Sequence, residues 1–219
     1  MEIKTKFFGK INIADEQIII FPYGIYGFEN AGRFVLLHDE EDEENKENEE
    51  DENNTIFRWL QCIDDENLCF TVMEPEFICK GYNPKLPANA FNMLKKLGAG
   101  KELNGNNANT VNLNKDELIY LVIAVIYEDI EESTANLLGP IVINSKIKIG
   151  AQIILESSEP QNSEYKIKHK IFNSYNNNSD LFSEQAECEY KELYDVYDAY
   201  EDDQNMKIER MESIEKVTI

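Results

Sequence analysis

The chain has 219 residues and a formal net charge of −22. This length allows one sizeable domain with a buried core and an appendage, but not two domains of ordinary size. The charge is concentrated, because residues 39–54 carry eleven carboxylates against one lysine, and residues 173–219 carry thirteen carboxylates against four basic side chains. The rest of the chain is close to neutral, so the overall charge alone does not indicate a partner.

Several classes of protein are excluded by what the sequence lacks. No apolar run approaches the ~20 residues that span a bilayer, and the N-terminus has neither the apolar region nor the cleavage site of a signal peptide. We therefore expect a cytoplasmic protein that does not use a membrane. The two histidines are far apart and the four cysteines form no Cys-x-x-Cys pair. Neither a metal nor a cofactor is expected, and Cys62 and Cys69 are expected to be buried, reduced thiols.

Short apolar runs separated by turn signals predict strands along most of the chain. In chain order these runs are Ile3–Phe8, Gln17–Phe21, Arg33–Leu37, Ile56–Ile63, Leu68–Met73, Leu118–Tyr127, Ala135–Leu138, Ile141–Asn144 and Gln152–Leu155. The polar turn Asp64–Asn67 predicts a hairpin between the fourth and fifth runs. The ten-residue run 118–127 predicts a central strand covered on both faces. The fold class is therefore mainly β, a small antiparallel barrel-like or sandwich domain over residues 1–172.

Helix is scarce in this domain, and other segments lack any hydrophobic period. A short helix is predicted over Ala88–Leu97, where apolar side chains fall three residues apart behind Pro87. Residues 98–114 are rich in glycine and asparagine and are interpreted as a mobile loop. Residues 39–54 contain no apolar side chain, so we expect a disordered insert between two strands.

The acidic C-terminal extension, residues 173–219, differs in kind from the insert because it carries an apolar stripe. The stripe has spacings of three and four residues and consists of Phe182, Ala186, Tyr190, Leu193, Tyr197 and Tyr200. This pattern predicts an amphipathic helix. We expect the stripe of residues 182–200 to dock on the domain or to extend the interface with a partner.

Catalytic and nucleic-acid-binding interpretations find little support. No nucleotide-binding, metalloprotease or serine-hydrolase motif is present. The adjacent carboxylates Asp64–Asp65 and Glu131–Glu132 allow a glycosidase hypothesis, but such pairs are far more often turn residues on a solvated surface. A small basic and aromatic cluster, residues 165–172, is explained equally well by an edge strand.

Three longer segments carry more information. They are FPYGIYGFEN (residues 21–30), FRWLQCIDDENLCFTVMEP (residues 57–75) and NLLGPIVIN (residues 136–144). In the first, two glycines three residues apart favour a tight reversal that presents aromatic side chains. In the second, the only tryptophan, Trp59, is expected in the core, and Gln61 does not fit a wholly apolar face.

In this order, the three segments resemble the FliW family of bacterial flagellar assembly factors, whose pattern is approximately FPxGLPGFE, WLQSxDDPxLAFxVxDP and NLLAPIVIN. The resemblance covers roughly residues 3–172, with a final strand near Ile171. It implies a small β-barrel-like fold, no enzymatic activity and two protein partners. These are flagellin and the translational repressor CsrA, a small dimeric RNA-binding protein.

The mechanism that the resemblance implies is partner switching, by a protein that is a monomer when free. Free flagellin occupies the factor, and after flagellin export the factor binds CsrA and prevents it from repressing flagellin translation. Such switching needs coupling of only a few kcal/mol. The resemblance favours an allosteric route over blocking of the RNA site, and both routes stay open at this point. This sequence departs from the pattern at Tyr26, Asn67 and Gly139, where the family usually has proline, proline and alanine.

Two other hypotheses come from different classes: a carbohydrate-active β-sandwich enzyme, and an acidic nucleic-acid mimic that occupies the RNA site of a regulator. For the leading hypothesis, polar members of the three segments and the aromatic loop are the candidate protein-binding residues. They are Tyr23, Tyr26, Glu29, Asp64, Asp65, Glu74, Asn136 and Asn144.

Overall fold

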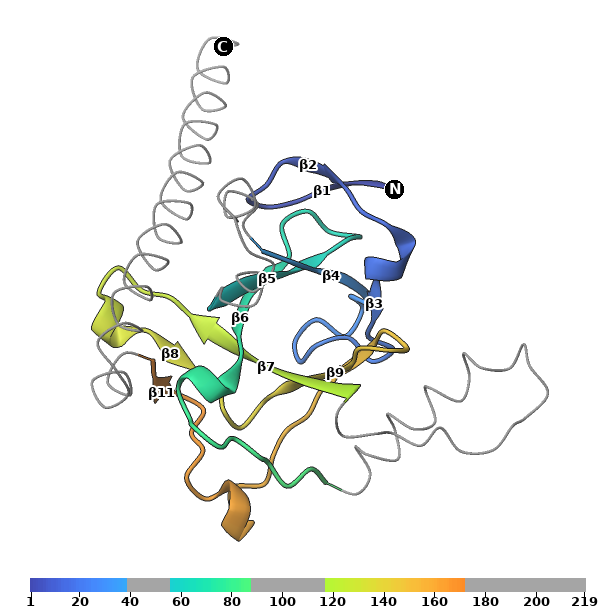
Figure 1. Cartoon of the computed structure of the whole chain (residues 1–219). Helices are drawn as coiled ribbons and strands as arrows, with labels where there is room; N and C mark the ends of the chain where they lie inside the picture. Colours follow the sequence, from blue (N-terminus) through green and yellow to red (C-terminus); the bar gives the residue numbers. More distant parts are fainter. Residues whose placement is uncertain (39–55, 88–116, 172–219) are drawn as a thin grey trace, which may run out of the picture.

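The longest strand of the sheet, β7 (Leu118–Val125), is formed by the most apolar run of the sequence. The computed structural model describes residues 1–38, 56–87 and 117–171 (Figure 1). The predicted helix Ala88–Leu97, the loop 98–114, the insert 39–54 and the extension 173–219 lie outside the described residues.

The other described strands are short. They are β1 (Glu2–Lys4), β2 (Lys10–Asn12), β3 (Ile19–Ile20), β4 (Arg33–Leu37), β5 (Phe57–Cys62), β6 (Cys69–Met73), β8 (Thr134–Ala135), β9 (Ile141–Asn144), β10 (Ile149–Gln152) and β11 (His169–Lys170). Short 3-10 segments occur at Asp15–Gln17, Pro75–Phe77, Ile130–Glu132 and Pro160–Asn162, and the described residues contain no α-helix.

The main sheet closes into a barrel. Its strand order is β11-β8-β7-β6-β5-β4-β3-β10-β9, and β9 pairs back with β7, so the strands from β7 round to β9 form a ring. Among the described strands, the one parallel pair is β3 with β10, through Ile20 and Ile149. The predicted mainly β, barrel-like fold is confirmed, and this parallel pair makes the sheet mixed instead of wholly antiparallel.

Most predicted strands match observed ones, but three differ in position. The run Ala135–Leu138 is wrong beyond Ala135, because β8 is Thr134–Ala135 and the chain turns at Leu137 and Leu138. Arg33–Leu37 and the β5–β6 hairpin are confirmed. The run Ile3–Phe8 is wrong beyond Lys4, because the chain reverses in a turn where the Thr5 amide donates to the Gly9 carbonyl at 2.7 Å. The run Gln152–Leu155 is also misplaced, because β10 ends at Gln152. The last residues of the predicted run instead form hydrogen bonds with the segment that follows Leu137.

The interior of the barrel is filled by apolar side chains from alternate positions of the ring strands. This interior core contains Phe21, Ile25, Phe34, Leu60, Cys62, Val72, Leu121, Ile141 and Ile143. At Gly150 the packing leaves no space for a side chain, since an added Cβ would lie 2.5 Å from Cζ of Phe21.

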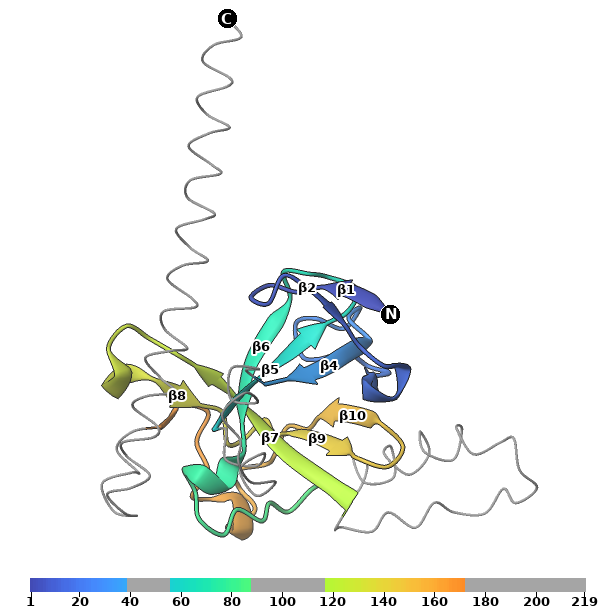
Figure 2. The same cartoon turned by 45° about the horizontal axis from the view of Figure 1, so that its top comes forward.

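The outer surface of the barrel is also covered. Side chains that point outward from β5, β7 and β9, including Trp59 and Val122, pack under the segments 74–87 and 153–171. Trp59 is 4% exposed and meets the Phe8 ring edge-on, so its predicted core position is confirmed. The β1–β2 ribbon covers the outer face of β4 through Ile3 and Val35, and Figure 2 shows this ribbon lying over one side of the barrel. The central strand is thus covered on both faces only in its middle, since Val125 is exposed.

Gln61 is a fully buried polar side chain that holds the β5–β6 turn. Its amide nitrogen donates to the carbonyls of Cys62, Asp65 and Leu68 at 2.9–3.2 Å, and its Oε1 accepts from the Lys6 amide at 3.0 Å. A buried polar group must find such partners. One side chain therefore satisfies backbone groups of the hairpin and of the N-terminal segment.

We expect Gln61→Leu to lower the free energy of unfolding by about 2–4 kcal/mol, because it removes the acceptor of the Lys6 amide and one donor to the Cys62, Asp65 and Leu68 carbonyls. Urea denaturation measures this change. The control is Gln17→Leu, which removes one exposed hydrogen bond to the Ala14 amide and should cost less than about 1 kcal/mol. Equal losses for the two variants would contradict the role given to Gln61.

Candidate protein-binding surface

The loop of residues 21–32 joins β3 to β4 and reverses the chain twice within a few residues. Gly24 and Gly27 have φ angles of +65° and +84°, a region that side chains disfavour. The Gly24 amide donates to the Phe21 carbonyl at 3.0 Å, and the Phe28 amide donates to the Ile25 carbonyl at 2.7 Å. The two-glycine pattern therefore builds the tight reversal that the sequence predicts.

This loop buries one side chain and presents three aromatic ones. Ile25 is 1% exposed and enters the interior core, which anchors the loop. Tyr23, Tyr26 and Phe28 are 62%, 64% and 44% exposed, and we call these three residues the aromatic surface. Phe28 also meets the Phe70 ring of β6 edge-on, with centroids 5.3 Å apart. An exposed apolar group on an anchored loop is typical of a protein-binding site.

Gln152, at the end of β10, braces the same loop. Its Oε1 accepts from the Tyr26 amide at 3.0 Å, and its Nε2 donates to the Gly139 carbonyl at 3.2 Å. The first and third family segments are therefore linked through one side chain. The departures at Tyr26 and Gly139 fit this link: a proline has no amide to donate, and a Cβ at residue 139 would lie 2.7 Å from Nδ2 of Asn136.

Glu29 belongs to the loop and stabilises its turn. Its exposed carboxylate accepts from the Gly27 amide at 3.0 Å. Hydrogen bonds from the backbone amides of Glu29 itself and of Gly27 lower the pKa of this carboxyl. A lowered pKa means that the stabilisation is present above the ordinary carboxyl pKa and is lost as the pH falls through the lowered value.

The carboxylates predicted as contacts at the two ends of the β5–β6 hairpin all have partners within the chain. Asp64 pairs with Arg33 through two hydrogen bonds, and Asp65 accepts from the Asn67 amide at 3.0 Å, which forms the hairpin turn. Glu74 pairs with Arg58 at the opposite end of the hairpin. Asp64 and Asp65 are exposed and Glu74 is half-buried. Arg33 directly follows the loop of residues 21–32. Asp64 and Asp65 therefore lie at the same end of the β4–β5 pair as this loop, whereas Glu74 lies at the other end.

The two asparagines at the ends of the segment NLLGPIVIN stabilise turns. The half-buried Asn136 accepts from the Leu138 amide at 3.1 Å. Asn144 is 1% exposed, and its Oδ1 accepts from the amides of Lys146 and Ile147 in the β9–β10 turn. Asn144 therefore reaches no partner unless this turn opens, whereas Asn136 lies beside the Gly139 end of the Gln152 link.

The structure brings together Tyr23, Tyr26, Glu29 and, through Gln152, Asn136. Sequence reasoning did not single out Phe28 as a contact, although it stands in the same motif, and it missed Gln152 entirely. Only the pattern of the loop could have indicated Phe28. Nothing in the sequence indicates that Gln152, 126 residues after Tyr26, reaches that amide.

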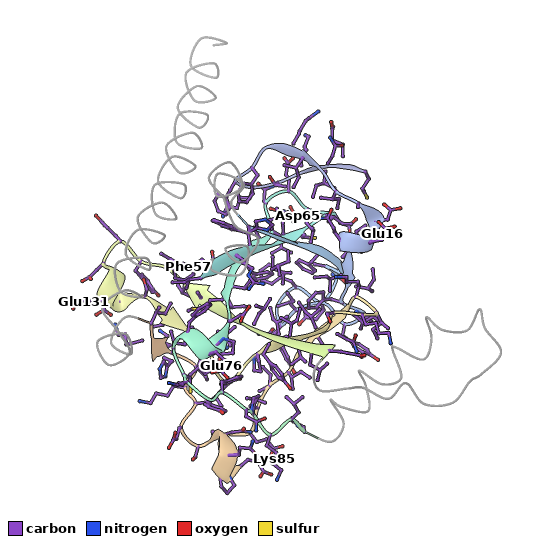
Figure 3. All side chains as sticks on the ribbon, in the orientation of Figure 1. Glu16, Phe57, Asp65, Glu76, Lys85 and Glu131 are labelled. Atoms are coloured by element: carbon purple, nitrogen blue, oxygen red, sulfur yellow. The ribbon has the colours of Figure 1, made fainter. Side chains whose placement is uncertain are left out.

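Other kinds of site find no basis in the described chain. No group of three or more His, Cys, Asp or Glu side chains within it could hold a metal ion. The paired-carboxylate motifs do not meet, since Asp65 and Glu131 lie on different sides of the domain (Figure 3). Burial raises the pKa of the Cys69 thiol to about 12, so this thiol is a poor nucleophile at neutral pH. No helix of the described part is long and apolar enough to cross a membrane.

The fold and the surface define a small, closed β-barrel that displays aromatic side chains on a braced loop. A family model described as FliW protein matches residues 2–171. The chain belongs to the FliW family, which confirms the resemblance.

Known relatives and a solved structure agree with this assignment. The flagellar assembly factor FliW of Leptospira interrogans is 33% identical over 80% of this chain and 95% of its own length. The protein of the same description from Caldanaerobacter subterraneus subsp. tengcongensis is 35% identical over 81% of this chain and 97% of its own. A crystal structure of the flagellar assembly factor FliW aligns with a TM-score of 0.57 and 28% identity, covering 78% of this chain and 97% of the other.

The two loop glycines predict a sharp contrast between substitutions. Gly24→Ala should destabilise the protein by about 3 kcal/mol or more, because its Cβ would lie 2.3 Å from the Phe28 carbonyl oxygen in addition to the positive φ. Gly27→Ala should cost about 1 kcal/mol, since its Cβ meets nothing within 4 Å. Chemical denaturation of both variants tests this, and similar costs would show that the loop is not rigidly braced.

Proposed function

We propose that this protein is a flagellar assembly factor that binds flagellin and antagonises a CsrA-type translational regulator. Membership of the FliW family supports the assembly role. The observation that carries the binding proposal is the aromatic surface, three exposed rings held on a loop that its own glycines, Ile25 and Gln152 fix in place. No nucleic acid, metal or cofactor enters this proposal, and the protein acts in the cytoplasm as a monomer when free.

Flagellin is the partner that we assign to the aromatic surface. A subunit that awaits assembly carries apolar surface that will be buried in the filament, and exposed apolar surface of this kind binds complementary apolar surface. Tyrosine contributes large, stiff contact area at low entropic cost, and a few such side chains commonly supply most of the binding energy. Asp64, Asp65 and Asn136 would lie at the border of this interface, and Glu29 would hold the loop in shape.

Antagonism of the regulator follows if the flagellin-bound and regulator-bound states exclude each other. A coupling of about 1–3 kcal/mol between the two partners changes either affinity 5- to 150-fold. The glycosidase alternative receives no support, because Asp64 and Asp65 are engaged with Arg33 and with their own turn. The nucleic-acid-mimic alternative depends on residues 39–54, which lie outside the described part of the chain.

We expect the double variant Tyr23→Ser/Tyr26→Ser to bind flagellin at least about 30-fold more weakly, because each exposed ring contributes about 1 kcal/mol or more to such an interface. Isothermal titration calorimetry with purified flagellin measures the loss. The matched control is Tyr127→Ser, which removes an exposed tyrosine beyond the end of β7 and outside the loop of residues 21–32 and should leave the affinity unchanged.

Binding of the regulator is tested by competition. When flagellin and a CsrA-type protein compete for the wild-type factor, native mass spectrometry should show at least about fivefold weaker regulator binding at saturating flagellin. Unaltered flagellin binding by the double variant would overturn the surface assignment. A strong fall of regulator affinity between low and high salt, together with loss on deleting residues 39–54, would favour the nucleic-acid mimic.

A further inference from the structure

The end of β7 extends beyond the barrel as a three-stranded ribbon with β8 and β11 (Figure 1). Across this ribbon, Ala124, Ala135 and His169 form one row, and Val125, Thr134 and Lys170 form the next. Neighbouring rows point to opposite faces. Ala124 and Ala135 are buried in the outer core, so the row that contains Val125 points away from the barrel.

This outward face carries exposed apolar side chains. Val125 and Tyr127 are each 47% exposed, although both belong to the apolar run from which β7 forms. We call the exposed pair Val125 and Tyr127 the ribbon face; Thr134, the partner of Val125 on β8, is buried at 8% exposure. β11 is the last strand of the sheet among the described residues, and exposed apolar side chains on such a ribbon form a surface that proteins usually cover.

The chain leaves the described part at this ribbon. Ile171 is fully buried, and its amide donates to the Ser133 carbonyl at 3.1 Å. Lys170 and Val125 lie two strands apart, about 10 Å at the usual strand spacing. The family match also ends at residue 171, so the residues that follow lie beyond this match and start beside the ribbon face.

The sequence of these following residues complements the ribbon face in polarity and complements the exposed lysines that precede β11 in charge. Residues 182–200 carry the apolar stripe, and residues 173–219 have thirteen carboxylates against four basic side chains. Lys166 and Lys168, which lead into β11, are exposed and form no ion pair with a described residue. The carboxylates of the β7–β8 turn are partly neutralised, since Lys170 pairs with Glu132 at 2.7 Å.

We propose that residues 182–200 dock on the ribbon face of the same chain, with the apolar stripe over Val125 and Tyr127 and the acidic flank towards Lys166 and Lys168. Residues 173–181 reach up to about 30 Å when extended, which is ample for this contact. A stripe of 19 residues in helical form is about 28 Å long and about 10 Å wide, close to the width of three strands. The short tether gives an effective concentration in the mM range, so even a weak contact is populated.

Cross-linking tests this docking in the full-length protein. Native Cys188 lies within the stripe, between Ala186 and Tyr190. We expect Val125→Cys to form an intramolecular cross-link with Cys188 through a short bismaleimide at least about fivefold more efficiently than the control Tyr26→Cys, which is more exposed. Mass spectrometry identifies the linked peptides. The native thiols Cys62, Cys69 and Cys79 have pKa values raised by burial, so they react slowly.

Two further variants make the outcome decisive. Tyr127→Cys should cross-link like Val125→Cys, which protects the test against misfolding of either variant. Leu193→Asp, in the middle of the stripe, should reduce the Val125→Cys cross-link several-fold. Equal linking at Tyr26→Cys, a covalent dimer as the main product, or no effect of Leu193→Asp would each overturn the proposal. The covalent dimer would assign the ribbon face to a second copy of the chain.

Discussion

The structure depends on the way in which one edge of β7 pairs with two different strands. β9 pairs with its first half, from Leu118 to Leu121, and β8 pairs with Ala124 and Val125. Between Asn136 and Ile141 the chain bulges outward, so four residues stand opposite the single residue Val122. Without this bulge, β9 would continue the register of β8 and would miss the position from which it closes the barrel with β10.

Burial holds the bulge in place. Leu137 is fully buried in the outer core, and its carbonyl accepts from the Tyr82 hydroxyl at 2.8 Å. Desolvation raises the pKa of Tyr82, so the hydroxyl stays protonated and remains a donor. The Leu137 amide donates to the Lys166 carbonyl, which joins the bulge to the segment that leads into β11. A fully buried leucine contributes about 2–3 kcal/mol by burial alone, before these hydrogen bonds are counted.

The sequence predicts the local parts of this structure and misses the contacts that connect them. Apolar runs and the Asp64–Asn67 turn identify β4, β5, β6, β7 and β9, because these strands need only their own pattern to be recognised. Barrel closure depends on the bulge and on the parallel β3–β10 pair, and Gln61 joins the N-terminal segment to the β5–β6 hairpin. The hydrophobic periodicity of a single segment carries no information about such long-range pairings.

The candidate site likewise has features that the sequence predicts and others that it does not. The two loop glycines correctly indicate exposed aromatic residues, because positive φ angles and short turns are local properties. The polar residues were harder to place. Asp64 pairs with Arg33, Glu74 pairs with Arg58 and Asn144 is buried, and each of these outcomes depends on a neighbour supplied by the folded sheet. A carboxylate that appears free in a sequence is therefore weak evidence for a binding contact.

The bulge also determines how the two exposed apolar surfaces are related. Gly139 at its end binds Gln152, which braces the aromatic loop, and Asn136 at its start donates from its backbone amide to Ile123, next to the ribbon. Shifting the bulge would expose Leu137 and break its bonds to Tyr82 and Lys166, at a cost of several kcal/mol. Coupling between binding sites rarely exceeds about 3 kcal/mol. A ligand on either surface therefore lacks the energy to rearrange the bulge, and the barrel is better suited to hold the two surfaces at a fixed separation than to transmit a change between them.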